Sequence, residues 1–247
     1  RNALIQASTY IAILIGSLAG TLVILTSYGE TLLAFLLVIF AILGWLSSCY
    51  IQKIAVKNDK LHVNLNPFTG LWKIMQLSFA DSRIFKIIIA ISWFWFIGAT
   101  YITQFPTYVK TILHADESVV GFFLIVFSIG IGSGALLCNT ILKGKINAKY
   151  VPWAALGMVL FGIDLYFASP LITKETSQGL ATLSLFLSSL KNHRIIVDLG
   201  MIAVFGGLYV VPLYAMLQKY SKALSRSRII AANNVMNALF MVISGTF

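Results

Sequence analysis

The segment that decides the fold spans residues 84–109 and reads IFKIIIAISWFWFIGATYITQFPTYV. Its one Lys or Arg is Lys86, near the start, and it contains no Asp or Glu. A helix needs about 20 predominantly apolar residues to cross the hydrocarbon core of a bilayer, which is about 30 Å thick. Lipid offers the backbone no hydrogen-bond partner, so a crossing segment must satisfy its own N–H and C=O groups. We therefore predict a transmembrane helix here.

The same pattern recurs along the whole chain. Of its 247 residues, 59% are hydrophobic and 11% are charged, whereas soluble domains are about 45–50% apolar and about 25% charged. The apolar residues gather in seven long blocks, which lie at residues 3–25, 31–51, 84–109, 119–142, 151–169 and 195–217 and from residue 229 onward. We predict an all-α membrane protein in which each block is a transmembrane helix.

The net charge of +10 does not indicate a nucleic-acid partner, because the cations gather in the breaks between the apolar blocks. Of the 18 Lys and Arg residues, fourteen lie at the N-terminus or in and beside the breaks after the second, fourth and sixth blocks: Arg1, Lys53, Lys57, Lys60, Lys73, Arg83, Lys86, Lys143, Lys145, Lys149, Lys219, Lys222, Arg226 and Arg228. The other four are Lys110, Lys174, Lys191 and Arg194. Cytoplasmic loops are enriched in Lys and Arg, so the larger set predicts the cytoplasmic face and a cytoplasmic N-terminus.

The longest break, residues 52–83, divides the chain. Residues 1–51 carry two predicted helices and residues 84–247 carry five. The middle of the break, from about residue 67 to residue 79, mixes aromatic and aliphatic residues with polar ones. That mixture predicts an amphipathic helix at the membrane surface, and a disordered basic linker is the alternative. Because the chain starts without Met and stops inside an apolar block, we expect it to be a fragment.

Another break, residues 170–194, contains an apolar run at residues 180–190. This run is too short to span a bilayer. We expect a short helix against the outer surface, or a tucked loop.

Small residues predict where helices pack closely. Gly16 and Gly20 form one G-x-x-x-G pair, and Gly130 and Gly134 form another. Small residues let helix backbones approach each other inside a membrane, where the hydrophobic drive between helices is missing. We expect tight helix interfaces at both pairs.

Polar residues inside the blocks are the candidates for binding. Gln6 and Thr9 share one face of the first predicted helix with the first glycine pair. In the third block, Trp93 begins an aromatic run that either lines a cavity or fills the core. Thr100 and Gln104 follow it, and polar groups in a span usually face the bundle or a wet cavity.

Two asparagines mark the seventh block. Asn233 and Asn237 are one helical turn apart and so share a face. An amide in contact with lipid tails is costly, so both must meet another helix or line a polar path, and the sequence favours neither reading. Asp164 and Asp198 are also candidates, with hydration or a local ion pair near the outer interface as the alternative.

No enzyme site is evident in the sequence. No Ser-His-Asp set, catalytic carboxylate pair or metal cluster emerges, and His62, His114 and His193 all lie in breaks. Cys49 and Cys138 lie in apolar blocks, where cysteine behaves as a small hydrophobe. We therefore expect no catalytic residue, metal or cofactor.

Four runs carry a family resemblance. They are residues 2–9 with 12–17, residues 91–96 with Gln104, Pro106, Tyr108 and residues 116–120, residues 206–213 with Ala215, Leu217 and Gln218, and residues 226–234. The first and third runs resemble helices five and ten of bacterial lysophospholipid transporters, in the major facilitator superfamily. The second and fourth resemble the transporter region that some bacteria fuse ahead of a phospholipid acyltransferase and an acyl-activating domain (acyl-ACP–phospholipid O-acyltransferase fusion proteins).

The resemblance implies a partial major facilitator bundle, in which the seven blocks are helices five to eleven of twelve. It also implies a transporter, not an enzyme, that flips lysophospholipid, chiefly lysophosphatidylethanolamine, across the bacterial inner membrane for re-acylation. The expected substrate contacts are Gln6, Thr9, Trp93, Thr100, Gln104, Asn233 and Asn237. The expected partners are the membrane lipid and a fused or separate acyltransferase. A facilitator for a drug, sugar or peptide, a membrane anchor for the acyltransferase, and an inert remnant of a split gene are the alternatives.

Overall fold

The computed structural model describes residues 28–50, 67–142, 147–169, 179–222 and 225–246, and isolated positions among the first 26 residues. These residues form helices and, apart from one isolated bridge between Ala115 and Ala181, no β-structure. The helices are α2 (Gly29–Cys49), α3 (Pro67–Phe79), α4 (Ser82–Thr111), α5 (Glu117–Leu142), α6 (Val151–Ala168), α7 (Leu183–Ser188), α8 (Leu190–Tyr220) and α9 (Arg226–Ser244).

The predicted all-α membrane fold is confirmed. Five of the described helices, α2, α4, α5, α6 and α8, are long and apolar enough to cross a membrane. The remaining long helix, α9, has 19 residues but includes two arginines and three asparagines, and it is not among the five. The helix predicted at residues 3–25 lies outside the described residues except at isolated positions.

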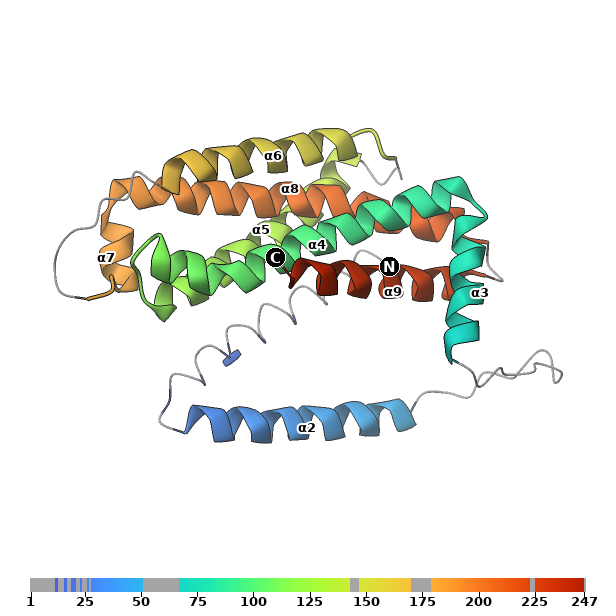
Figure 1. Cartoon of the computed structure of the whole chain (residues 1–247), viewed down its shortest axis with the longest axis horizontal. Helices are drawn as coiled ribbons and strands as arrows, with labels where there is room; N and C mark the ends of the chain where they lie inside the picture. The colour runs from blue at the N-terminus through green and yellow to red at the C-terminus, as the bar shows by residue number, and fades with distance from the viewer. Residues whose placement is uncertain are drawn as a thin grey trace.

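Five helices pack lengthwise into a bundle (Figure 1). Helix α8 is its centre, because it packs against both α5 and α6 and also contacts α4. Helix α9 packs against α4. Helix α2 lies apart from this bundle (Figure 1), and Gly29 is its one buried residue. Its exposed residues are apolar all round, as in a helix that faces lipid on every side.

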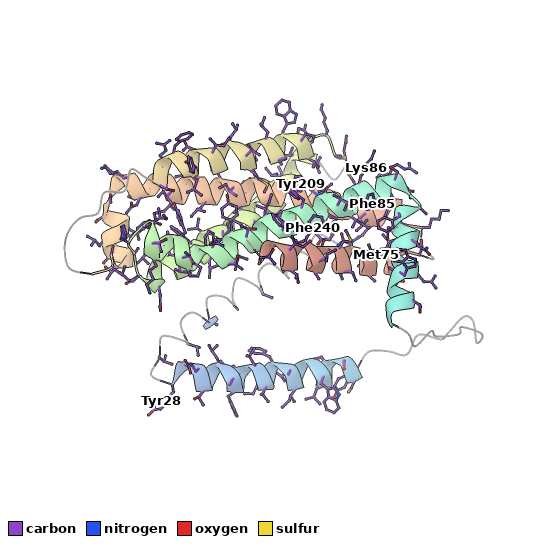
Figure 2. All side chains as sticks on the ribbon, in the orientation of Figure 1. Tyr28, Met75, Phe85, Lys86, Tyr209 and Phe240 are labelled. Atoms are coloured by element: carbon purple, nitrogen blue, oxygen red, sulfur yellow. The ribbon has the colours of Figure 1, made fainter. Side chains whose placement is uncertain are left out.

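Helix α3 lies across one end of the bundle, beside the points where α4 and α9 begin and α8 ends (Figure 1). Met75 points from α3 toward α9 (Figure 2) and is buried there. Asp81 begins α4 by accepting a hydrogen bond from the backbone N–H of Arg83 at 2.9 Å. The Arg83 guanidinium lies over the Tyr220 ring, 5.7 Å from its centroid, so the start of α4 meets the end of α8. We call this the α3 end.

The opposite end, the α7 end, is closed by hydrogen bonds between two loops. The N–H of Asp116 donates to the carbonyl of Ala181 at 3.0 Å, and the N–H of Ala181 donates to the carbonyl of His114 at 2.9 Å. The short run at residues 180–190 thus forms a short helix at this end, one of the two predicted forms. The breaks rich in Lys and Arg around Arg83 and Lys222 lie at the α3 end instead.

Two apolar cores fill the bundle. At the α7 end, Phe105, Val109, Phe123, Ile195 and Leu199 are buried together, with residues of α5 and α6 around them. Toward the α3 end, a second core joins α3, α4, α8 and α9: Met75, Ile84, Ile87, Ile88, Ile91, Phe94, Val210, Leu213, Leu217, Ile229, Ala232 and Met236. Helix α8 contributes to both cores and so ties the bundle together.

The closest helix approach is between α5 and α8. A Cβ added at Gly130 would lie 2.5 Å from the Cβ of Ala203, and one at Gly134 would collide with the backbone of Val204. On the α8 side of the contact lies Gly207, where an added Cβ would collide with the backbone of α5. These glycines let the two backbones touch. At Gly16 and Gly20, an added Cβ meets no described atom within 4 Å, so the interface predicted there remains a prediction.

Candidate functional site

A polar network lies in the membrane-spanning part of the bundle, between three helices. Ser92 and Trp95 come from α4, Tyr214 from α8, and Asn233 and Asn237 from α9. Ser92, Asn233 and Asn237 are buried, and the other two are half-buried. We call these five residues the Asn237 network.

Asn237 is the centre of this network. Its amide is satisfied in the orientation in which Nδ2 donates to Ser92 Oγ at 2.9 Å and to the Asn233 carbonyl at 3.1 Å. In that orientation Oδ1 accepts from Trp95 Nε1 at 3.2 Å and from Asn233 Nδ2 at 3.1 Å. Trp95 Nε1 also lies 2.9 Å from the Tyr214 hydroxyl. Asn237 therefore meets another helix, which was one of the two readings of the sequence, whereas the Asn233 amide bonds to Asn237 on its own helix.

One atom of the network has no partner among the described residues. Asn233 is fully buried, and its Oδ1 atom has no hydrogen-bond donor there. A buried acceptor without a donor costs about 1–3 kcal/mol. Such an atom marks a place where a donor group can be bound.

Three cavities lie beside α4, on the side away from the Asn237 network, with volumes of about 320, 330 and 490 Å³. The second and third share Ile97 and Tyr101 in their walls. We call the three cavities together the α4 groove. Their walls come from α4, α6 and α8: Phe85, Lys86, Ile89, Ala90, Trp93 and Tyr209 line the first, Phe96, Ile97, Thr100, Tyr101, Gln104, Phe105, Tyr108, Leu165 and Leu199 the second, and Ile97, Tyr101, Met158, Val159, Gly162, Ile163, Tyr166, Phe167 and Ile202 the third. Figure 2 shows Phe85 and Lys86 at the α3 end of α4.

The aromatic run of α4 is divided between the groove and the interior. Trp93 is 52% exposed and stacks on Phe96, with 5.2 Å between ring centroids, so it lines the groove. Phe94 is buried in the core and Trp95 belongs to the Asn237 network. A helix turns about 100° per residue, so neighbours in this run point to different surroundings.

The structure brings the predicted substrate contacts together in two places, not one. Trp93, Thr100 and Gln104 line the α4 groove, while Asn233 and Asn237 belong to the network. Within the groove, the Thr100 hydroxyl donates to the carbonyl of Phe96 at 2.9 Å. Gln6 and Thr9 lie outside the described residues.

Two polar residues of the network, Ser92 and Tyr214, were not singled out in the sequence. Ser92 stands alone between apolar residues in the middle of α4, and that isolation was the available signal. Tyr214 carried no such signal, because a tyrosine near a helix end is common at membrane interfaces. Its hydroxyl becomes informative once Trp95 is seen beside it.

A third polar group lies at the α7 end. Arg194 on α8 donates to both carboxylate oxygens of Asp164 on α6, at 2.9 Å from Nε and 2.5 Å from Nη2. This is the local ion pair that the sequence offered as one explanation of the carboxylates. Asp198, one turn further along α8, is buried. No cluster of three metal-binding side chains occurs in the described part of the chain.

Several membrane-length helices packed into one bundle define a multi-pass membrane protein. The family model of the Major Facilitator Superfamily matches residues 1–245, and the chain belongs to that superfamily. It is therefore a transporter chain, as the resemblance implied at this level. No curated protein and no solved structure matches it.

Proposed function

We propose that the protein carrying this chain moves a lysophospholipid, chiefly lysophosphatidylethanolamine, inward across the bacterial inner membrane for re-acylation. The observation that carries the proposal is the α4 groove, whose walls are apolar and aromatic but include a few polar groups. Ligand pockets have about this composition, with volumes of about 300–1,000 Å³. A lysophospholipid matches it because it joins one acyl tail to a small polar head.

The polar groups suit the parts of the headgroup. Lys86, at the α3 end of the groove, offers a cation to the phosphate. Thr100 and Gln104 offer hydrogen bonds further along.

Alternating access supplies the route of the lipid across the membrane. In major facilitator transporters, one half rocks against the other around a site near the midplane. We propose that residues 1–51 belong to the first half, residues 52–83 to the cytoplasmic connection and residues 84–247 to the second half, with the N-terminus in the cytoplasm.

A lipid-movement assay tests the function. The intact protein that carries this chain is reconstituted in liposomes, and labelled lysophosphatidylethanolamine is followed between the leaflets. We expect the double substitution Thr100→Val with Gln104→Leu to slow the movement of the lipid by about tenfold. A loss of about 1.4 kcal/mol of interaction free energy corresponds to such a factor. Thr103→Val is the matched control, because Thr103 also bonds to its own helix but lines no described cavity.

The same assay separates the alternatives. Movement no faster than in empty liposomes would remove the lipid function and leave the role of a membrane anchor for an acyltransferase. Uptake of a labelled drug, sugar or peptide into the same liposomes, without movement of the lipid, would identify a facilitator for another solute.

A further inference from the structure

Among the described residues, the acidic pair at the α7 end has one positive charge too few. Asp164 on α6 and Asp198 on α8 interact electrostatically with each other and with Arg194. Arg194 is the one cation that interacts with them among the described residues. Two carboxylates and one guanidinium leave a net charge of −1 when all three are ionised.

That excess charge falls on the buried member. The side chains of Asp164 and Arg194 are 41% and 46% exposed, so water reaches the ion pair. Asp198 is 2% exposed, and its Oδ2 atom has no partner among the described residues. A buried carboxylate is very costly unless it is paired, and the guanidinium is already engaged by both oxygens of Asp164.

Among the described residues, the other surroundings of Asp198 supply no second cation. On α4, Tyr108 interacts with it electrostatically, and the hydroxyl of Tyr108 is hydrogen-bonded to Ser169 at 2.7 Å. The six residues of α7 include no ionisable side chain. Helix α5 includes Glu117 and Cys138, which bring no positive charge.

We propose that Asp164 and Asp198 form a proton-binding site, in which one proton taken up by Asp198 is donated as a hydrogen bond to Asp164. Binding adds H⁺ to the Asp198 carboxylate and breaks no other bond. The group of Asp164, Arg194 and Asp198 is then electrically neutral. A metal cation fits less well, because hard cations need several oxygen ligands and both oxygens of Asp164 already accept from Arg194.

Infrared spectroscopy of the purified protein tests this site, since a protonated carboxyl has its own C=O stretching band. We expect one such band to appear as the pH falls, before the exposed carboxyls are protonated. Asp198→Asn should abolish it and Glu117→Gln, on an exposed carboxyl at the start of α5, should leave it. Asparagine can still donate a hydrogen bond to Asp164, so the fold should survive this substitution.

Substitution of the two neighbouring charged residues should move the pH midpoint of the band in opposite directions. A cluster with only a structural role would show no such shifts. Arg194→Gln should move the midpoint of the band to higher pH, and Asp164→Asn should move it to lower pH, each by about tenfold or more in proton affinity. A band that survives Asp198→Asn, or midpoints that do not move in these directions, would overturn the proposal. So would a midpoint that depends on sodium when choline is the replacement cation. None of these readouts depends on the transported substrate.

Discussion

At the residue scale, Asn237 connects α9 to α4 by hydrogen bonds. Among the described residues, it is the one residue of α9 that bonds to α4 in this way. Its amide bonds to Ser92, Trp95 and Asn233. Asn237→Ala should lower the free energy of unfolding by about 1–3 kcal/mol, because buried polar partners are left unsatisfied. Thermal unfolding in detergent, followed by circular dichroism, measures it. Asn234→Ala changes the exposed neighbour and should have little effect; equal losses in the two variants would show that the network does not stabilise the bundle.

Asp81 is the residue whose pH dependence is easiest to isolate, because it lies outside the spanning helices. The backbone N–H of Arg83, which donates to its carboxylate, holds the pKa of Asp81 below its usual value of 3.8. A lowered folded pKa means that the ionised form stabilises the start of α4. This contribution to stability is fully present when the pH is above the ordinary pKa of aspartate. It is lost as the pH falls from that value through the lower pKa of the folded state.

Hydrogen exchange at the first turn of α4 checks this prediction. Protection should fall in strong acid in the wild type. Asp81→Asn should remove the pH dependence while keeping a good cap, since asparagine is also favoured at this position. If the two proteins lost protection in parallel as the pH fell, another group would be responsible.

At the element scale, the contact between α5 and α8 depends on the absence of side chains. Gly134→Ala and Gly207→Ala each place a Cβ against backbone, with the carbonyl carbon of Val204 at 2.9 Å from the first and the nitrogen of Ala135 at 2.8 Å from the second. Backbone cannot turn aside as a side chain can, so each should cost about 1–3 kcal/mol or more through overpacking. Gly132→Ala meets nothing within 4 Å and should be neutral or slightly stabilising.

Unfolding midpoints of the three variants in detergent provide the measurement. Equal stability of Gly132→Ala and Gly134→Ala would mean that the helices do not touch as described. The G-x-x-x-G pattern indicated a tight contact at Gly134, but it could not indicate the partner. Gly207 stands in no such pattern, and its role is visible only when α5 lies against it.

The existence of the elements was more predictable than their pairing. Long apolar runs and cationic breaks indicate helix positions because membrane thickness and loop charge act on each segment separately. Pairing depends on contacts between similarly apolar faces, which the sequence does not distinguish. For this reason Trp93, Thr100 and Gln104 could be chosen as polar or aromatic residues within a span, but the groove they line needed the positions of α6 and α8.

At the scale of the whole molecule, the distribution of Lys and Arg predicts which end of the bundle faces the cytoplasm. Cysteines placed one at a time at Lys149, Lys222 and Lys191, in a protein without Cys49 and Cys138, can be labelled with a reagent that does not cross membranes. Lys149→Cys and Lys222→Cys should react from the same, cytoplasmic side, and Lys191→Cys from the other. Reaction of the first two from opposite sides would remove the predicted topology.

The polar composition of α9 has a consequence for biogenesis. Helix α2 is apolar enough to leave the translocon and settle in lipid alone, whereas α9 carries three asparagines and falls short of the other long helices in hydropathy. The amide of Asn237 finds partners on α4, which is synthesised well over a hundred residues earlier. We expect α9 to remain beside the translocon until α4 is available to it. Entry of α9 into the bilayer is then a cooperative step, in which α4 provides the surface that α9 binds.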